Sequence, residues 1–121
     1  MTIMQIISQL DAQLPNTAST EQKVGWLSRI DQQVKHETLD THENAVEFNG
    51  YTEETPGDTT LLIPEPYDEC YIRYMEAQIH YSMGEMSRYK NSMMLFNTVY
   101  AAFSSWYHRT HTPVNAGDFR I

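Results

Sequence analysis

The chain has 121 residues, a formal net charge of −8 and a single cysteine, Cys70. The length predicts one domain over residues 1–121, and a lone cysteine excludes an internal disulfide bond. An acidic chain without a basic patch is a poor candidate for binding DNA by attraction. No run approaches the ~18 apolar residues of a membrane span.

The first part of the chain predicts two helices, because its apolar residues follow helical spacing. The first helix carries Ile3, Ile6, Ile7, Leu10 and Leu14, and Pro15 ends it. The second begins near Ser19, since Ser19 and Gln22 fit a capping box, in which each side chain satisfies the other residue's free backbone donor. It carries the stripe Val24, Leu27, Ile30 and Val34 and extends to about Thr41.

The middle third supplies the whole net charge. Ten acidic side chains and no Lys or Arg lie between Glu37 and Glu69. This pattern is typical either of a solvated acidic loop or of a surface that repels nucleic acid or binds a basic partner. Residues 43–63 contain turn signals at 49–50 and 56–58, so we expect a long irregular loop, with a small β-hairpin as an alternative. Irregular segments of this length are often functional.

The second half predicts a helical hairpin. Pro64 to Pro66 opens a third helix, because proline is tolerated in the first turn, and this helix extends to Met83. Gly84 separates it from a fourth helix, which extends from Glu85 to about Arg109, and the two run antiparallel. Residues 110–121 are predicted to form an irregular tail. The fold class is therefore all-α, with four helices.

Both later helices carry two apolar stripes, although a surface helix needs only one. Two stripes indicate either burial in the centre of the protomer or contact with a partner. We predict a contact between subunits, formed by Trp26, Ile72, Met75, Ile79, Leu95, Val99 and Trp106. The same hairpin should bring Tyr71 and Tyr74 against the segment 89–96 or its neighbours in the core.

The sequence offers no reaction chemistry. His108 and His111 lack a third metal ligand at a recognisable spacing. The carboxylates beside Cys70 would raise the pKa of its thiol and weaken it as a nucleophile, so we interpret Cys70 as a buried structural residue. No phosphate-binding loop or hydrolase motif is present. We therefore predict no catalytic residues, no metal, no cofactor and no enzymatic activity.

Several segments resemble one family. They are EQKVGWLSRID at 21–31, LLIPEPYDECY at 61–71, GEMSRYKNS at 84–92, Phe96 with Asn97, and RTHTP at 109–113. Together they resemble the head–tail connector (neck adaptor, or head-completion) proteins of long-tailed phages and prophages, over roughly residues 2–113. The resemblance implies a largely helical protein without catalytic residues. It also implies a ring beneath the portal, usually of twelve subunits, that prolongs the DNA channel and receives the tail or the next neck protein.

This resemblance sets the expected roles. The chain would be made in the host bacterial cytoplasm and reside in the virion neck, and DNA would pass through the ring without specific binding. We expect Glu47, Glu53, Glu54 and Asp58 to face the channel and Phe119, Arg120 and Ile121 to dock on the portal. The alternatives are a small acidic phage-encoded inhibitor that binds a basic partner surface and, less in keeping with the residues, a metal-dependent enzyme.

Overall fold

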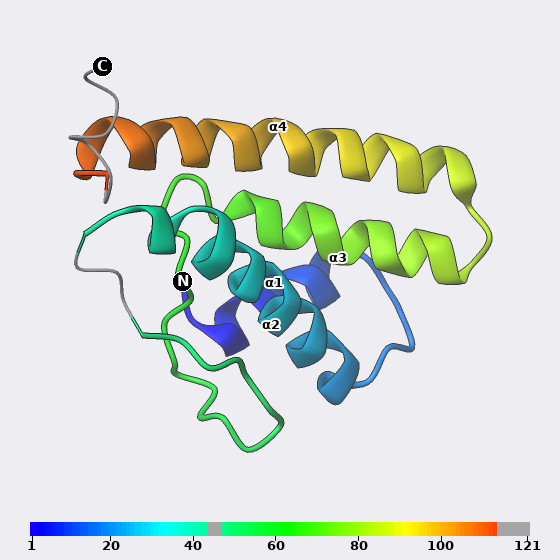
Figure 1. Cartoon of the computed structure of the whole chain (residues 1–121). Coiled ribbons are helices and arrows are strands. Elements are labelled where there is room, and N and C mark those ends of the chain that lie inside the picture. The colour runs from blue at the N-terminus through cyan, green and yellow to red at the C-terminus, as the bar shows by residue number, and fades with distance from the viewer. Residues whose placement is uncertain (44–46, 114–121) are drawn as a thin grey trace.

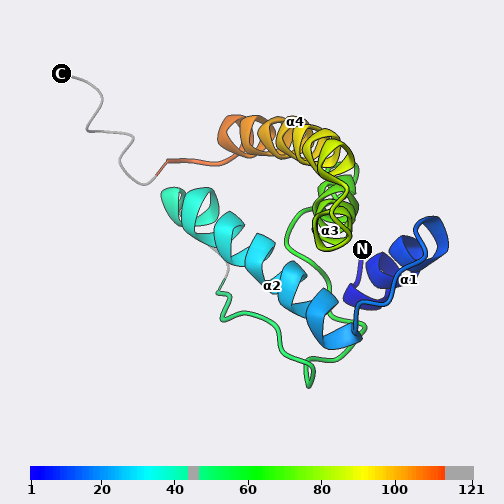
Figure 2. The same cartoon turned by 90° about the vertical axis from the view of Figure 1, so that its right-hand side faces the viewer.

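The computed structural model describes residues 1–43 and 47–113, and its regular elements are all helices. They are α1 (Ile3–Gln13), α2 (Thr20–Glu37), the short 3₁₀ helix η1 (Leu39–Thr41), α3 (Glu69–Ser82) and α4 (Met86–Thr110). α3 lies in the middle, with α4 on one side and α1 and α2 on the other (Figure 1 and Figure 2). The described ranges contain two isolated bridges and no strand, so the predicted all-α, four-helix fold is confirmed.

Both N-terminal helices begin with a capping box. At α2, the Ser19 hydroxyl accepts from the Gln22 amide at 3.1 Å, and the Gln22 side chain accepts from the Ser19 amide at 2.9 Å, as the sequence predicts. α1 has the same arrangement at Thr2 and Gln5, which the sequence reading missed. Each box satisfies two of the backbone donors that a helix N-terminus leaves without an internal partner.

Two helix boundaries differ from the predicted ones. α2 ends at Glu37 rather than near Thr41, and η1 follows it. α3 begins at Glu69 rather than within 64–66. The reason is that a residue before a proline is disfavoured in the α conformation, and Glu65 stands in that position. The helix dipole favours an anion in the first turn of a helix. Glu65 lies before that turn of α3 and does not gain this stabilisation.

The predicted hairpin of α3 and α4 is confirmed. Gly84 lies between the helices with φ +76°, a left-handed conformation that glycine adopts without steric cost. Tyr74 of α3 packs against Phe96 of α4, with ring centroids 5.4 Å apart, as predicted. Tyr71 is completely buried in the core, which also agrees with the prediction, and its hydroxyl donates to Asp31 of α2.

The loop after η1 forms no hairpin within 47–63 and pairs instead with the start of α1. The amide of Ile3 donates to the carbonyl of Thr59, and the amide of Met4 donates to the carbonyl of Gly57, both at 3.0 Å. These bonds complete the capping of α1, because the free amides of its first turn now have acceptors. The position of the loop is therefore fixed by the end of a helix rather than by a second strand.

A buried carboxylate joins this loop to the helices. Asp31 of α2 is fully buried and accepts three hydrogen bonds. The Tyr51 hydroxyl of the loop and the Tyr71 hydroxyl of α3 each donate to it at 2.5 Å, and the Leu62 amide donates at 3.1 Å. The Tyr71 hydroxyl in turn accepts from the amide of Ile63 at 2.8 Å. One side chain therefore holds α2, α3 and both ends of the loop together.

Burial shifts the pKa values of Asp31 and of the two tyrosines that donate to it. Desolvation raises the pKa of Asp31, and the three donated hydrogen bonds oppose that shift. Burial, followed by the charge of Asp31, also raises the pKa values of Tyr51 and Tyr71 above their ordinary range. Both tyrosines therefore remain protonated and available as donors at neutral pH.

We predict that Asp31→Ala lowers the free energy of unfolding by about 3 kcal/mol or more, because it leaves two hydroxyls and one amide buried without an acceptor. Asp40→Ala is the control. Asp40 is an exposed carboxylate paired with Lys35 at 2.6 Å, and surface pairs of this kind contribute about 1 kcal/mol or less. Urea unfolding of both variants measures the difference. Equal losses would contradict a structural role for Asp31.

Two glycine-to-alanine substitutions should change the free energy of unfolding in opposite directions. A Cβ at either Gly84 or Gly25 would meet no atom within 4 Å, so only backbone conformation distinguishes them. Gly84→Ala places alanine at positive φ and should destabilise by about 1 kcal/mol, whereas Gly25→Ala within α2 should stabilise by about 0.5–1 kcal/mol. Thermal unfolding checks both. A stabilising Gly84→Ala would mean that the turn differs from the one described.

Candidate functional site

The described residues hold no cluster of three or more His, Cys, Asp or Glu side chains arranged to bind a metal ion. Cys70 is completely buried in α3. Burial, with smaller contributions from the charges of Asp31 and Asp68, raises the pKa of its thiol. The thiol therefore stays protonated at neutral pH and is a poor nucleophile, which agrees with its interpretation as a structural cysteine.

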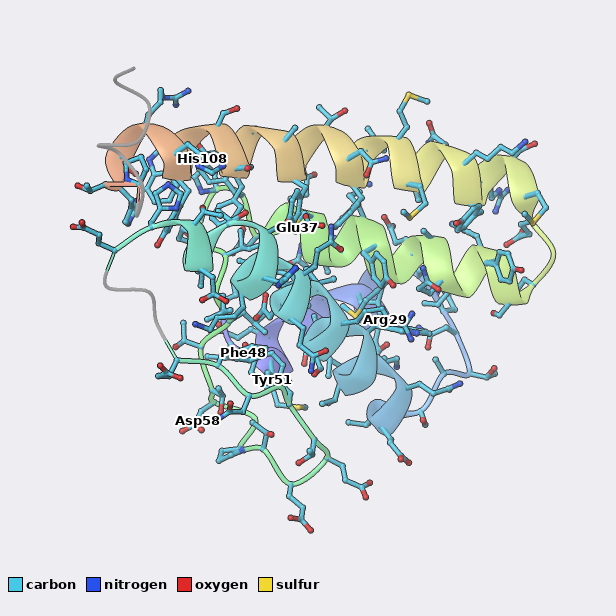
Figure 3. The ribbon with its side chains drawn as sticks, viewed as in Figure 1. Arg29, Glu37, Phe48, Tyr51, Asp58 and His108 are labelled. Carbon is cyan, nitrogen blue, oxygen red and sulfur yellow. The ribbon has the colours of Figure 1, made fainter. Side chains whose placement is uncertain are left out.

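The histidines near the end of α4 bond within the chain. His42 Nδ1 lies 2.8 Å from the carbonyl of Thr38 and must donate to it, so in the neutral ring Nε2 accepts from His108 Nδ1 at 3.0 Å. His111 stacks on Tyr107 with ring centroids 3.6 Å apart. This cluster attaches the end of α4 (His108 in Figure 3) to the turn after α2. The sequence reading did not foresee the part of His42, because 66 positions separate it from His108.

Three of the predicted interface residues belong to the core of the protomer. Ile72, Met75 and Ile79 of α3 are at most 3% exposed and pack with the buried residues of α1 and α2. The prediction that they contact a neighbouring subunit is therefore wrong. The physical reason is that α3 lies between two layers of helices, so its second apolar stripe is used within the chain.

The other predicted interface residues remain at least partly at the surface. Leu95 is 37% exposed, and Trp26, Val99 and Trp106 are half-buried against the edge of the core. Trp106 also contacts Tyr67, two residues before α3, with ring centroids 5.7 Å apart. These four residues are the ones that a partner could still reach.

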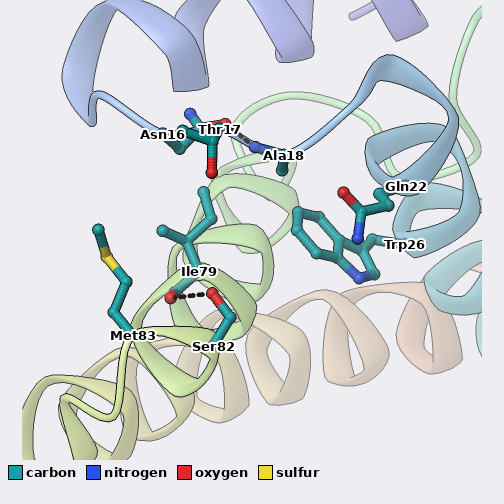
Figure 4. Close-up of a pocket in the computed structure, with 8 residues that line it drawn as sticks. All are labelled: Asn16, Thr17, Ala18, Gln22, Trp26, Ile79, Ser82 and Met83. Carbon is teal, nitrogen blue, oxygen red and sulfur yellow. Dashed lines mark hydrogen bonds between the residues drawn. The ribbon is translucent and has the colours of Figure 1, made fainter.

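A shallow groove lies beside Trp26, between α2, α3 and the connection that joins α1 to α2 (Figure 4). Its volume is about 330 Å³, and its lining contains no charged residue. The polar side chains Asn16 and Ser82 are engaged locally, with the amide of Ala18 at 3.1 Å and the carbonyl of Ile79 at 2.7 Å. The groove therefore offers an aromatic wall for packing and no group suited to acid–base chemistry.

α4 presents most of its surface to solvent. Of its 25 residues only Ser92, Phe96, Phe103 and Tyr107 are buried. Its first half carries a stripe at spacings of four, which we call the α4 stripe and which consists of Met86, Lys90 and Met94. Met94 is 61% exposed and Met86 44%. The described chain therefore leaves this apolar part of α4 uncovered.

The charge of α4 differs from that of the rest of the chain. Its sequence contains Arg88, Lys90 and Arg109 but no Asp or Glu. Arg88 lies 3.5 Å from Glu85 at the exposed start of the helix, while Lys90 and Arg109 make no ion pair within the described residues. The charged side chains of α4 are therefore all cations and lie toward its two ends, on a protein with a net charge of −8.

The predicted channel-facing acids share another surface, which we call the acidic loop (47–58). Glu47, Glu53, Glu54 and Asp58 are all exposed, and none of them forms an ion pair inside the ranges that the structure covers. The loop lies on the opposite side of the molecule from α4 in both views (Figure 1 and Figure 2), with Asp58 at its outer edge (Figure 3). The fold thus separates the acidic loop from the acid-free helix α4.

The comparisons with known proteins identify no relative: no family model matches the chain, and neither a curated protein nor a solved structure matches it. None of the helices that the structure describes is long and apolar enough to cross a membrane. The predicted portal-docking residues Phe119, Arg120 and Ile121 lie outside the described residues. The observations that bear on function are therefore the positions of α4 and of the acidic loop on the fold.

Two methionines test the division between core and surface. We predict that Met75→Ala lowers the free energy of unfolding by about 2–5 kcal/mol, since it removes a side chain that is completely buried. Met94→Ala should change it by about 0.5 kcal/mol or less, because exposed side chains contribute little to folding. Urea unfolding compares the two. A large loss for Met94→Ala would show that its surroundings in the folded protein are not those described.

Proposed function

We propose that the chain is a structural neck protein of a tailed phage, a head–tail connector whose copies form a ring beneath the portal. One observation carries the proposal. α4 is a 25-residue helix that packs along α3 and leaves Met86, Met94 and Leu95 exposed. No other element within the described residues covers these three side chains. Exposed apolar side chains on a long helix are typical of a surface that binds a partner.

A ring fits the separation of surfaces on this fold. In a ring every subunit uses two different surfaces, one toward each neighbour, and the acidic loop and α4 are two different surfaces on opposite sides. The proposed partners are further copies of the chain, the portal protein, and the tail or next neck protein. The resemblance of the sequence to neck adaptors suggests twelve copies, with the number set by the portal.

The remaining roles are proposals of the same kind. A protein with a net charge of −8 would let DNA slide through the ring without specific binding, because like charges on wall and phosphate prevent adhesion. The residues Phe119, Arg120 and Ile121 would grip the portal. In this proposal the protein catalyses no reaction, and it resides in the virion neck.

A second candidate function is a small acidic inhibitor that binds a basic partner surface. The observation that favours it is the acidic loop, in which Glu47, Glu53, Glu54 and Asp58 are exposed and lack ion-pair partners within the described part of the chain. Such a protein would act as a monomer or dimer and would not remain in the particle.

The two functions differ in where the protein is found and in how many copies. We predict that purified particles of the phage that encodes the chain contain it in a fixed ratio to the portal protein, about one to one, and that two-dimensional class averages of detached necks show a ring. Quantitative mass spectrometry of virions measures the ratio, with the major capsid protein as an internal standard. Absence from particles, together with a monomeric state in infected cells, would instead favour the inhibitor.

A further inference from the structure

We propose that the acidic loop of one copy binds the first half of α4 on the next copy. This inference deepens the proposed function and rests on its premise that copies of the chain associate. The contact is between the α4 stripe, Met86, Lys90 and Met94, and the exposed acids Glu53 and Glu54. The occupant of the uncovered face of α4 is therefore a second copy of this chain.

The first argument is charge complementarity. Arg88 and Lys90 lie on a helix without a single acidic residue, and the loop lies within a stretch of ten acids without a single base. Lys90, Glu53 and Glu54 form no ion pair within the described residues, whereas Arg88 lies 3.5 Å from Glu85. Complementary charges of this kind steer association and determine its register.

The second argument concerns the position of Arg88. Arg88 lies in the first turn of α4, where the helix dipole favours an anion and disfavours a cation. Its side chain is 70% exposed, so it adds little to packing within the protomer. The pair with Glu85, three residues earlier, offsets part of this cost, and the exposed guanidinium stays within reach of a partner.

Both surfaces also have an apolar part. On the acidic side Met4 of α1 is 46% exposed and lies directly against the loop, where a Cβ at Gly57 would come within 2.2 Å of the Met4 side chain. On the other side Met86 and Met94 flank Lys90. A contact that joins the two surfaces would remove methionine side chains from water, and methionine adapts readily to an irregular partner.

The third argument is geometric. The acidic loop and α4 lie on opposite sides of the molecule (Figure 1 and Figure 2), so the loop cannot reach α4 of its own chain. A contact between two different surfaces is heterologous, and it continues from copy to copy until the rotation closes a ring. In such a ring Glu53 and Glu54 lie between neighbouring subunits rather than on the wall of the DNA channel.

Reversing the charge of each of the two surfaces, in the full-length protein, tests the contact. Arg88→Glu with Lys90→Glu reverses the charge of the first half of α4. It should leave the helix folded, because a glutamate in the first turn suits the helix dipole and so offsets the loss of the exposed pair with Glu85. Glu53→Lys with Glu54→Lys reverses the loop. We expect each pair alone to weaken self-association about tenfold or more, measured by sedimentation velocity and native mass spectrometry at low salt. High salt should weaken association of the wild type.

The combination of all four substitutions provides the decisive variant, because it exchanges the two signs and keeps the wild-type net charge. We expect it to associate like the wild type, and we expect an equimolar mixture of the two singly reversed proteins to associate as well. Arg29→Glu with Gln33→Glu, on the exposed surface of α2, controls for added negative charge, since it changes the net charge by −3 against −4 for the α4 reversal. It also removes the exposed hydrogen bond from Arg29 to the Tyr74 hydroxyl. It should leave association unchanged.

Several outcomes would overturn the inference. The first is a wild-type protein that stays monomeric at its highest soluble concentration. The second is self-association that neither charge reversal weakens. The third is a four-substitution protein that does not regain the self-association of the wild type. The proposed function would survive each of these results if virions still contained the protein at the portal ratio, since the ring would then use other surfaces. Absence from virions would defeat the proposed function whatever the charge reversals show.

Discussion

The carboxylate of Asp31 is the constraint on which the arrangement of this chain depends. A buried carboxylate is expensive unless donors surround it, and here the donors come from three different segments: Tyr51, Leu62 and Tyr71. Each of these segments is positioned by the need to satisfy one charge. The irregular loop is therefore anchored to α2 through Tyr51 and Leu62, although it has no regular hydrogen-bond pattern of its own. The acids between these two anchors, Glu53, Glu54 and Asp58, are exposed on the surface.

Much of the fold could be predicted from periodicity and capping. Apolar spacing and the residues Ser19, Gln22 and Gly84 predict four helices and a hairpin, and the structure has them. The role of Asp31 could not be predicted, because in the sequence it is one charge among several and nothing marks it as buried. The predicted start of α3 was too early. A proline such as Pro64 is tolerated in the first turn of a helix, but Glu65 precedes a second proline, and this position disfavours the α conformation.

Predictions about surfaces were limited for a different reason. A stripe such as Ile72, Met75 and Ile79 shows that a helix face is covered, but periodicity does not reveal whether the cover comes from the same chain. Here α1 and α2 provide it. α4 is the opposite case, since its exposed methionines remain uncovered by the described residues. The charge pattern was informative for one segment, because the acidic loop (47–58) and the acid-free last helix occupy opposite sides of the folded molecule. Glu37, at the start of the acidic middle, instead accepts a hydrogen bond from Tyr100 of α4.

The histidine cluster at the end of α4 has a mechanical consequence. At one end the turn at Gly84 joins α4 to α3, and at the other His108 bonds to His42 while the amide of Glu43 donates to the carbonyl of Thr112 at 2.9 Å. A helix held at both ends cannot swing away from the body when something binds to its outer side. A partner therefore meets a surface that is already ordered, and association loses little conformational entropy on this side of the contact.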